Sequence, residues 1–206
     1  MIPLPADFEP WLNRIPGFED ARVGSITPVD GGASNITCRV ELLSSGARHV
    51  CLRLQRDRGI FEPYDVIREG RALRSLANSG VPVPRMLASE PSREPLGAPF
   101  VVMEWVAAPH MGAAPDASFA AFTAMVARIH SLDWQALGLG FLGVPGSVSA
   151  AIHGEIDLVA ARMPGFGCED DPLLTAALTS LRAAVPEHGR IALCQGDINI
   201  FNYLFR

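Results

Sequence analysis

The residues best suited to chemistry lie near the end of the chain, where Gly196-Asp197 follows a short apolar run and Asn202 comes five residues after the Asp. Kinase-type phosphoryl transfer uses this arrangement: the Asp takes the proton of the attacking hydroxyl, and the Asn holds Mg²⁺. An ordinary loop is the alternative, because Asp and Asn are also common turn-forming residues. A buried strand predicted at residues 191–194, directly before the motif, favours the functional interpretation.

A glycine-rich segment, Gly31-Gly32-Ala33-Ser34-Asn35, lies between two predicted strands. Small residues allow backbone N–H groups to come close to phosphate oxygens, which makes such a segment a candidate anion site. A glycine pair between strands is also typical of a plain hairpin turn. The sequence alone leaves both interpretations open.

Glu69 lies beside the apolar face of a helix predicted over residues 64–78. A carboxylate that points inward is costly unless it is paired. Arg53, on a strand one connection earlier, is the candidate partner, and kinases use such an ion pair to aim a cation at nucleotide phosphates. The alternative is that both residues lie on unrelated exposed surfaces.

The elements that must position these residues follow from apolar periodicity. Strands are predicted within residues 23–54, where turns separate three strands, and at residues 100–106. Helices are predicted near residues 64–78, 119–132, 149–162 and 171–185. A β-rich half followed by a mainly helical half predicts an α+β fold with two lobes, residues 1–106 and 107–206, and a hinge near residues 104–109.

Composition narrows the function classes. The 206 residues carry a formal net charge of -5 with scattered basic residues, which argues against a nucleic-acid partner. No apolar run approaches the ~20 residues that span a bilayer, so no membrane association is predicted. The four cysteines are widely spaced. This spacing is typical of reduced thiols and predicts a cytoplasmic protein.

Taken in order, five segments resemble the aminoglycoside phosphotransferase family of the protein-kinase-like fold. They are GGASNITCRV, REGRALRSLANSGVPVPRML, LGAPFVVMEWV, ARIHSLDWQALGL and LCQGDINIFNYLF, which fall between about Ala21 and Phe205. The branch found beside or fused to acyl-CoA dehydrogenases is the most similar. The resemblance implies an enzyme that uses ATP and Mg²⁺ and transfers the γ-phosphate to a hydroxyl of a small molecule. It also implies a β-rich nucleotide-binding lobe followed by a partial helical lobe.

The resemblance assigns roles by position. Gly31, Gly32, Ala33, Ser34 and Asn35 would cover the ATP phosphates. Arg53 would contact the α- and β-phosphates and pair with Glu69. The backbone of Met103, Glu104, Trp105 and Val106 would read adenine as the hinge. Asp197 would be the catalytic base and Asn202 a Mg²⁺ ligand, while His130 and Trp134 would support the helical lobe.

Three features depart from the family pattern. Lys usually stands where this chain has Arg53, and His where it has Gln195. The family also has a later metal-binding Asp, which is not found before Arg206, so we expect a truncated product or the first part of a longer chain. These departures keep open an alternative function, a catalytically silent nucleotide-binding or regulatory module. The acceptor is not determined by the sequence, although the dehydrogenase-linked branch favours a hydroxyacyl compound; the oligomeric state is also open.

Overall fold

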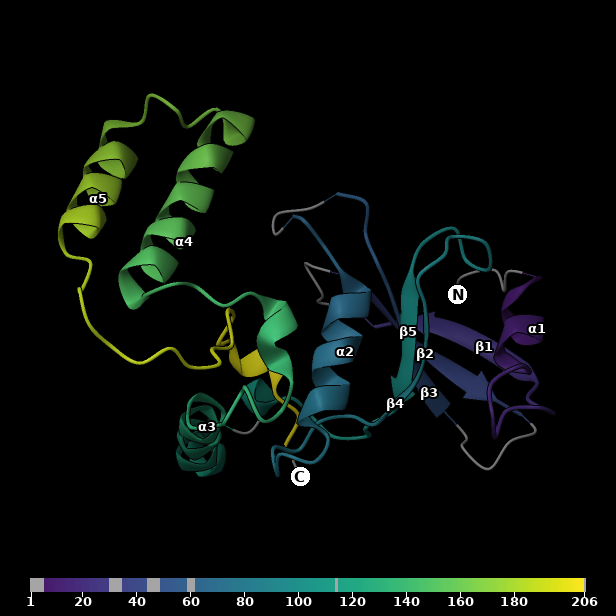
Figure 1. The fold of residues 1–206 in the computed structure, drawn as a ribbon. Coiled ribbons are helices and arrows are strands. Elements are labelled where there is room, and N and C mark those ends of the chain that lie inside the picture. Colours follow the sequence, from purple (N-terminus) through teal and green to yellow (C-terminus); the bar gives the residue numbers. More distant parts are fainter. Residues whose placement is uncertain (1–5, 30–34, 44–48, 59–61, 114, 206) are drawn as a thin grey trace. The chain divides into compact units, whose positions relative to one another are not determined.

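The computed structural model describes residues 6–29, 35–43, 49–58, 62–113 and 115–205 (Figure 1). The predicted phosphate-covering residues Gly31, Gly32, Ala33 and Ser34 lie outside this set. By packing, the chain divides into two compact units, Met1–Ile129 with Gln195–Arg206, and His130–Cys194. This division differs from the lobe boundary expected between residues 106 and 107, which stays a prediction.

An antiparallel sheet of five strands forms the centre of the first unit, in the order β1-β2-β3-β5-β4. The strands are β1 (Val23–Pro28), β2 (Ile36–Leu42), β3 (His49–Leu54), β4 (Met86–Glu90) and β5 (Phe100–Glu104). The predicted strands β1, β2, β3 and β5 are confirmed. β4 was not predicted, because its sequence MLASE has no β-branched residue. It is held instead by its pairing with β5.

One face of the sheet packs against α1 (Phe8–Leu12). Alternate residues of the strands, such as Val40, Leu52 and Val102, form the core with Phe8 and Trp11 of the helix. The Trp11 and Phe100 rings meet edge to face with their centroids 4.6 Å apart. The sequence did not predict this short helix, which depends on the core beneath it.

The other face carries α2 (Val66–Leu76), confirming the helix predicted there. The helix begins at Asp65, whose Oδ1 accepts a hydrogen bond from the backbone N–H of Arg68 at 2.8 Å. Gly70 allows a close approach to the sheet, since a Cβ at this position would lie 2.9 Å from Val101 Cγ1. This contact holds α2 close against β4 and β5.

α3 (Pro115–His130), up to Ile129, and the last residues of the chain also belong to the first unit. Tyr203 packs edge to face on Phe122 of α3, with ring centroids 4.7 Å apart. The Tyr203–Phe205 segment pairs with residues 109–111, around an isolated antiparallel bridge between Leu204 and His110. Met111 N–H donates to the Tyr203 carbonyl at 2.9 Å, and Phe205 N–H donates to the Pro109 carbonyl at 2.8 Å.

The second unit contains α4 (Val148–Arg162) and α5 (Pro172–Ala183), which confirm the two predicted helices. Trp134 supports this unit as expected, because its Nε1–H donates to the Ile191 carbonyl at 3.3 Å. The strand predicted at residues 191–194 was wrong: this apolar segment has no strand to pair with and runs as irregular chain. Within the described part of the chain, no helix is both long and apolar enough to cross a membrane.

Candidate active site

Arg53 and Glu69 form the ion pair that the sequence suggested. Arg53 Nε donates to Glu69 Oε2 at 2.8 Å, and Arg53 Nη1 donates to Thr37 Oγ1 at 3.3 Å. The side chains are 28% and 41% exposed, so the pair lies at the edge of the core, open to solvent on one side. A cation held in this way keeps its charge and a fixed direction.

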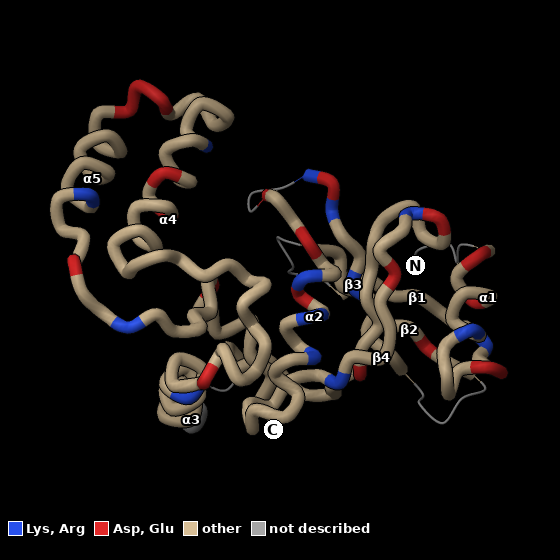
Figure 2. Tube along the Cα trace, in the orientation of Figure 1, with Lys and Arg blue, Asp and Glu red and all other residues tan. Residues whose placement is uncertain are grey.

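The strand register explains why these residues meet. Arg53 on β3 lies between Thr37 on β2 and Val101 on β5. Its side chain therefore points to the face that α2 covers, opposite the face of its buried neighbour Leu52. Glu69 is the only carboxylate on α2, a helix that carries both basic and acidic positions in Figure 2. Its Arg residues 68, 71 and 74 are exposed. Thr37 was missed at the sequence level, because only the register identifies it as the cross-strand neighbour of Arg53.

The side chain of Asn35 is buried beside this pair. Asn35 Nδ2 donates to Glu69 Oε1 at 2.8 Å, and Asn35 Oδ1 accepts from the backbone N–H of Arg56 at 3.3 Å. Both ends of the amide are therefore engaged within the protein. A nucleotide contact by Asn35 stays a prediction.

Cys51 lies on the same face of β3, two residues before Arg53. Burial raises the pKa of the Cys51 thiol to about 11, although the positive charge of Arg53 works in the opposite direction. The thiol is therefore neutral near pH 7 and is not a candidate nucleophile. Charge at this part of the site comes from the Arg53–Glu69 pair.

The predicted hinge begins within β5. Met103 is buried and pairs with Cys51 of β3, while Glu104 N–H donates to the Arg85 carbonyl at 2.9 Å. Trp105 is partly buried, with the Arg39 guanidinium 5.9 Å from its ring centroid. The Val106 carbonyl accepts from Ala108 N–H at 3.0 Å. The adenine-reading role of these residues stays a prediction.

Asp197 and Asn202 contact each other. Asn202 Nδ2 donates to Asp197 Oδ2 at 2.9 Å and to the Asp197 carbonyl at 3.2 Å. Asn202 ends a short 3-10 helix, Ile200–Asn202, which the side chain of Asn199 caps. This turn brings the two residues together across the five positions that separate them. One carboxylate oxygen of Asp197 is thus fixed by the protein.

Gln195 organises the same loop. Its Nε2 donates to the Asp197 carbonyl at 3.4 Å, and its Oε1 accepts a hydrogen bond from the Tyr203 hydroxyl. Burial first, and then the negative charge of Asp197, raise the pKa of Tyr203. Tyr203 was missed at the sequence level, because only the structure shows that its hydroxyl contacts Gln195.

The described residues offer few ligands for a Mg²⁺ ion bound together with a nucleotide. No cluster of three or more His, Cys, Asp or Glu side chains that could hold a metal occurs in the part of the chain that the structure describes. Mg²⁺ is often held by one or two protein oxygens together with substrate phosphates. Because its Nδ2 faces Asp197, Asn202 presents its Oδ1 as an oxygen ligand of this kind.

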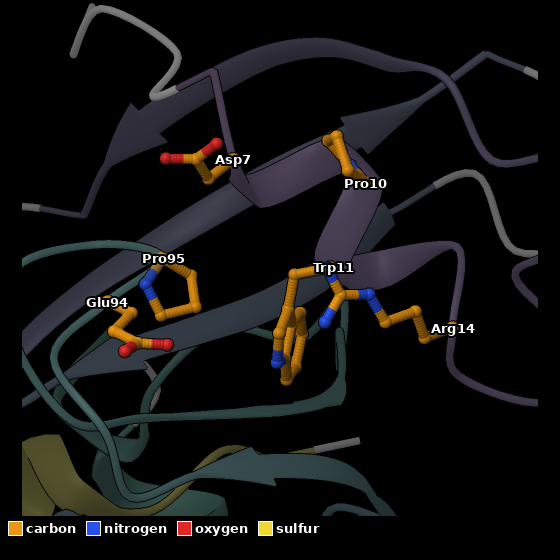
Figure 3. Close-up of a pocket in the computed structure, with 6 residues that line it drawn as sticks. All are labelled: Asp7, Pro10, Trp11, Arg14, Glu94 and Pro95. Carbon is orange, nitrogen blue, oxygen red and sulfur yellow. The ribbon is translucent and has the colours of Figure 1, made fainter.

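A hollow of about 240 Å³ lies between α1 and the loop before β5 (Figure 3). It is lined by Asp7, Pro10, Trp11, Arg14, Glu94 and Pro95. The Trp11 Nε1–H donates to Glu90 Oε2 at 2.7 Å, so the polar atom of the largest ring is already engaged. None of the predicted site residues lines this hollow, and it contributes nothing to the candidate active site.

Comparisons with known proteins agree with these observations. The model of the phosphotransferase enzyme family, APH, matches residues 25–206. Acyl-CoA dehydrogenase family member 10 of Mus musculus is 28% identical over 214 residues, which cover 98% of this chain and 19% of that protein. A candidate aminoglycoside phosphotransferase from Ralstonia eutropha JMP134 has a TM-score of 0.66 at 24% identity, covering 88% of this chain and 53% of that one.

The chain thus spans about a fifth of the mouse relative and about half of the bacterial structure. The likeness to the bacterial structure concerns the fold and confirms the α+β fold class. The resemblance stated from the sequence motifs, including the acyl-CoA dehydrogenase-linked branch, is also confirmed. Because the family model covers most of its length, this chain belongs to the APH phosphotransferase enzyme family.

Proposed function

We propose that this chain binds ATP with Mg²⁺ and transfers the γ-phosphate to a hydroxyl group of a small molecule. The observation that carries the proposal is the contact between the Asp197 carboxylate and the Asn202 amide. It joins, in one loop, an oxygen base and an oxygen ligand for a hard cation. Membership of a phosphotransferase family supports the same kind of enzyme.

Asp197 acts in this proposal as the base. Its Oδ2 accepts from Asn202 and is held in place, so its Oδ1 receives the proton of the acceptor hydroxyl. Arg53, fixed by Glu69, lends positive charge to the nucleotide phosphates. Asn202 Oδ1 would hold Mg²⁺, which neutralises charge that develops on the phosphoryl oxygens.

We further propose a hydroxyacyl compound as the acceptor. The mouse relative is named as an acyl-CoA dehydrogenase family member, and a kinase linked to such an enzyme has acyl compounds within reach. A hydroxyl on the acyl chain supplies the nucleophile that Asp197 requires. The cytoplasm, where ATP and acyl-CoA compounds occur, is the proposed location.

Calorimetry with ATP and Mg²⁺, followed by transfer assays on a panel of hydroxyl compounds, tests the proposal. We expect binding that needs Mg²⁺ and that Arg53→Ala weakens. The matched control is Arg22→Ala, since Arg22 forms an exposed ion pair with Glu9 at 3.3 Å elsewhere in the first unit. Binding without transfer to any acceptor would favour the nucleotide-binding module instead. Absence of binding would refute both functions.

A further inference from the structure

Asn35 differs from every other polar residue in the described part of the chain, because it alone is fully buried, at 1% exposure. A buried amide needs partners for both its donor and its acceptor. Those of Asn35 are the Glu69 carboxylate and the Arg56 backbone N–H. Asn35, the last residue of the glycine-rich segment, is therefore hydrogen-bonded both to helix α2 and to the backbone at Arg56.

The Glu69 carboxylate is shared between two donors. Its Oε1 accepts from Asn35 Nδ2, and its Oε2 accepts from Arg53 Nε, each at 2.8 Å. A half-exposed Glu side chain otherwise rotates among several conformers, at an entropic cost to any single one. Two donors on two oxygens fix both the position of the carboxylate and the plane in which it lies.

We propose that Asn35 is a positioning residue, which holds Glu69 so that Arg53 keeps one direction toward the nucleotide phosphates. The role of Arg53 in this inference rests on the proposed function, whereas the hydrogen-bond network does not. Asn35 acts through Glu69, and its amide is not required to touch the nucleotide. The amide orientation is itself fixed, because a flipped amide would place its oxygen against the carboxylate.

An exchange of donor and acceptor tests the inference. Asn35→Asp keeps the size of the side chain and an acceptor for Arg56 N–H, but it loses the donor and places two carboxylates face to face. Glu69→Gln alone places an amide donor against the Asn35 donor. In the double variant, the glutamine donates to the aspartate and its oxygen still accepts from Arg53. The double variant has one carboxylate at these two positions, as the unmodified chain does, so the formal net charge stays at -5.

We expect each single variant to weaken binding of ATP with Mg²⁺ by about tenfold, as for loss of one charge-assisted hydrogen bond. The double variant should bind within about threefold of the unmodified chain. Asn13→Ala is the matched control, because Asn13 lies at the end of α1 and its buried Oδ1 has no hydrogen-bond partner. The inference would be overturned if Asn35→Asp bound ATP as tightly as the unmodified chain. It would also be overturned if the double variant bound ATP no more tightly than the single variant with the lower affinity.

Hydrogen exchange of Arg53 Nε–H, followed by ¹⁵N NMR, is a readout that needs no nucleotide. Exchange should be faster in Asn35→Asp and in Asn35→Ala and slow again in the double variant, because position 35 again holds the side chain at position 69, whose oxygen accepts from Arg53. If the unmodified chain binds no ATP, the proposed function fails and the exchange rates still decide about Asn35. Equal exchange rates in all four proteins would show that Asn35 does not position Arg53.

Discussion

Replacing Arg53 by Lys makes a test of the nucleotide site possible, because the chain contains no Lys at all. By bond count the Lys ammonium takes the place of the Arg Cζ, so it can reach Glu69. It cannot also keep the hydrogen bond that Arg53 Nη1 donates to Thr37 at 3.3 Å. Loss of one such bond costs about 0.5–1.5 kcal/mol, so we expect binding of ATP with Mg²⁺ to weaken only about two- to tenfold.

The assay uses ATP that carries an acyl group on its γ-phosphate. A primary amine held at the phosphates attacks the acyl carbon, an amide forms, and ATP leaves. The α-amino group is the only primary amine in the unmodified chain, so intact mass and peptide mapping read the new site directly. Arg53→Lys should gain one acyl group at that residue, and excess ATP should prevent the gain.

Arg22→Lys is the matched control, since it places an amine on a side chain that is 73% exposed and paired with Glu9. We expect this amine to react slowly and without protection by ATP. The role of Arg53 is refuted if Arg53→Lys is acylated no faster than Arg22→Lys, or if ATP gives no protection. A folded Arg53→Lys protein, checked by its thermal unfolding, makes either result decisive.

Three further predictions concern other parts of the first unit. Asp197→Asn should lower the transfer rate about 10²- to 10⁴-fold and leave ATP affinity nearly unchanged, as expected for a general base; an unchanged rate in the transfer assay would rule out this role. In a Tyr64→Phe background, absorbance titration should show that Tyr203 ionises above ~10, because burial and then the charge of Asp197 raise its pKa. The stabilisation linked to this shift is present below ~10 and is lost as the pH rises through the raised pKa, and Asp197→Asn should reduce the shift. Gly70→Ala places a Cβ 2.9 Å from a methyl group of β5, so overpacking of about 1–3 kcal/mol should exceed a helix-propensity gain of about 1 kcal/mol. Denaturant unfolding should show lower stability, whereas the control Gly154→Ala, with open space around its Cβ, should show higher stability.

The ion pair of the site was predictable because its cause is local. Glu69 lies beside an apolar helix face, where an unpaired carboxylate is unfavourable. The strand that directly precedes this helix carries Arg53, which is therefore the candidate partner. The contact of Asp197 with Asn202 is also short in sequence. Local patterns suffice where the chain itself brings residues together.

Long-range pairing was not predictable in the same way. β4 has a sequence without strand preference and exists because β5 offers it hydrogen-bonding partners. The apolar segment at residues 191–194 has strand preference and no such partner, so it forms none. The pairing of Tyr203–Phe205 with Pro109 and Met111 joins segments more than ninety residues apart. Periodicity describes one segment, whereas a strand requires two.

The two substitutions that separate this chain from the family pattern share one physical property. Arg53 and Gln195 each bring a hydrogen-bonding atom that the usual side chain lacks: a further guanidinium nitrogen in place of a single ammonium, and an amide oxygen in place of a ring that has only nitrogens. In both cases the additional atom has a partner: Thr37 accepts from Arg53, and Tyr203 donates to Gln195. A site that had lost its chemistry would be under no constraint to keep such partners. The matched partners therefore favour a working phosphotransferase over a silent module, and this is the choice that the transfer assay decides.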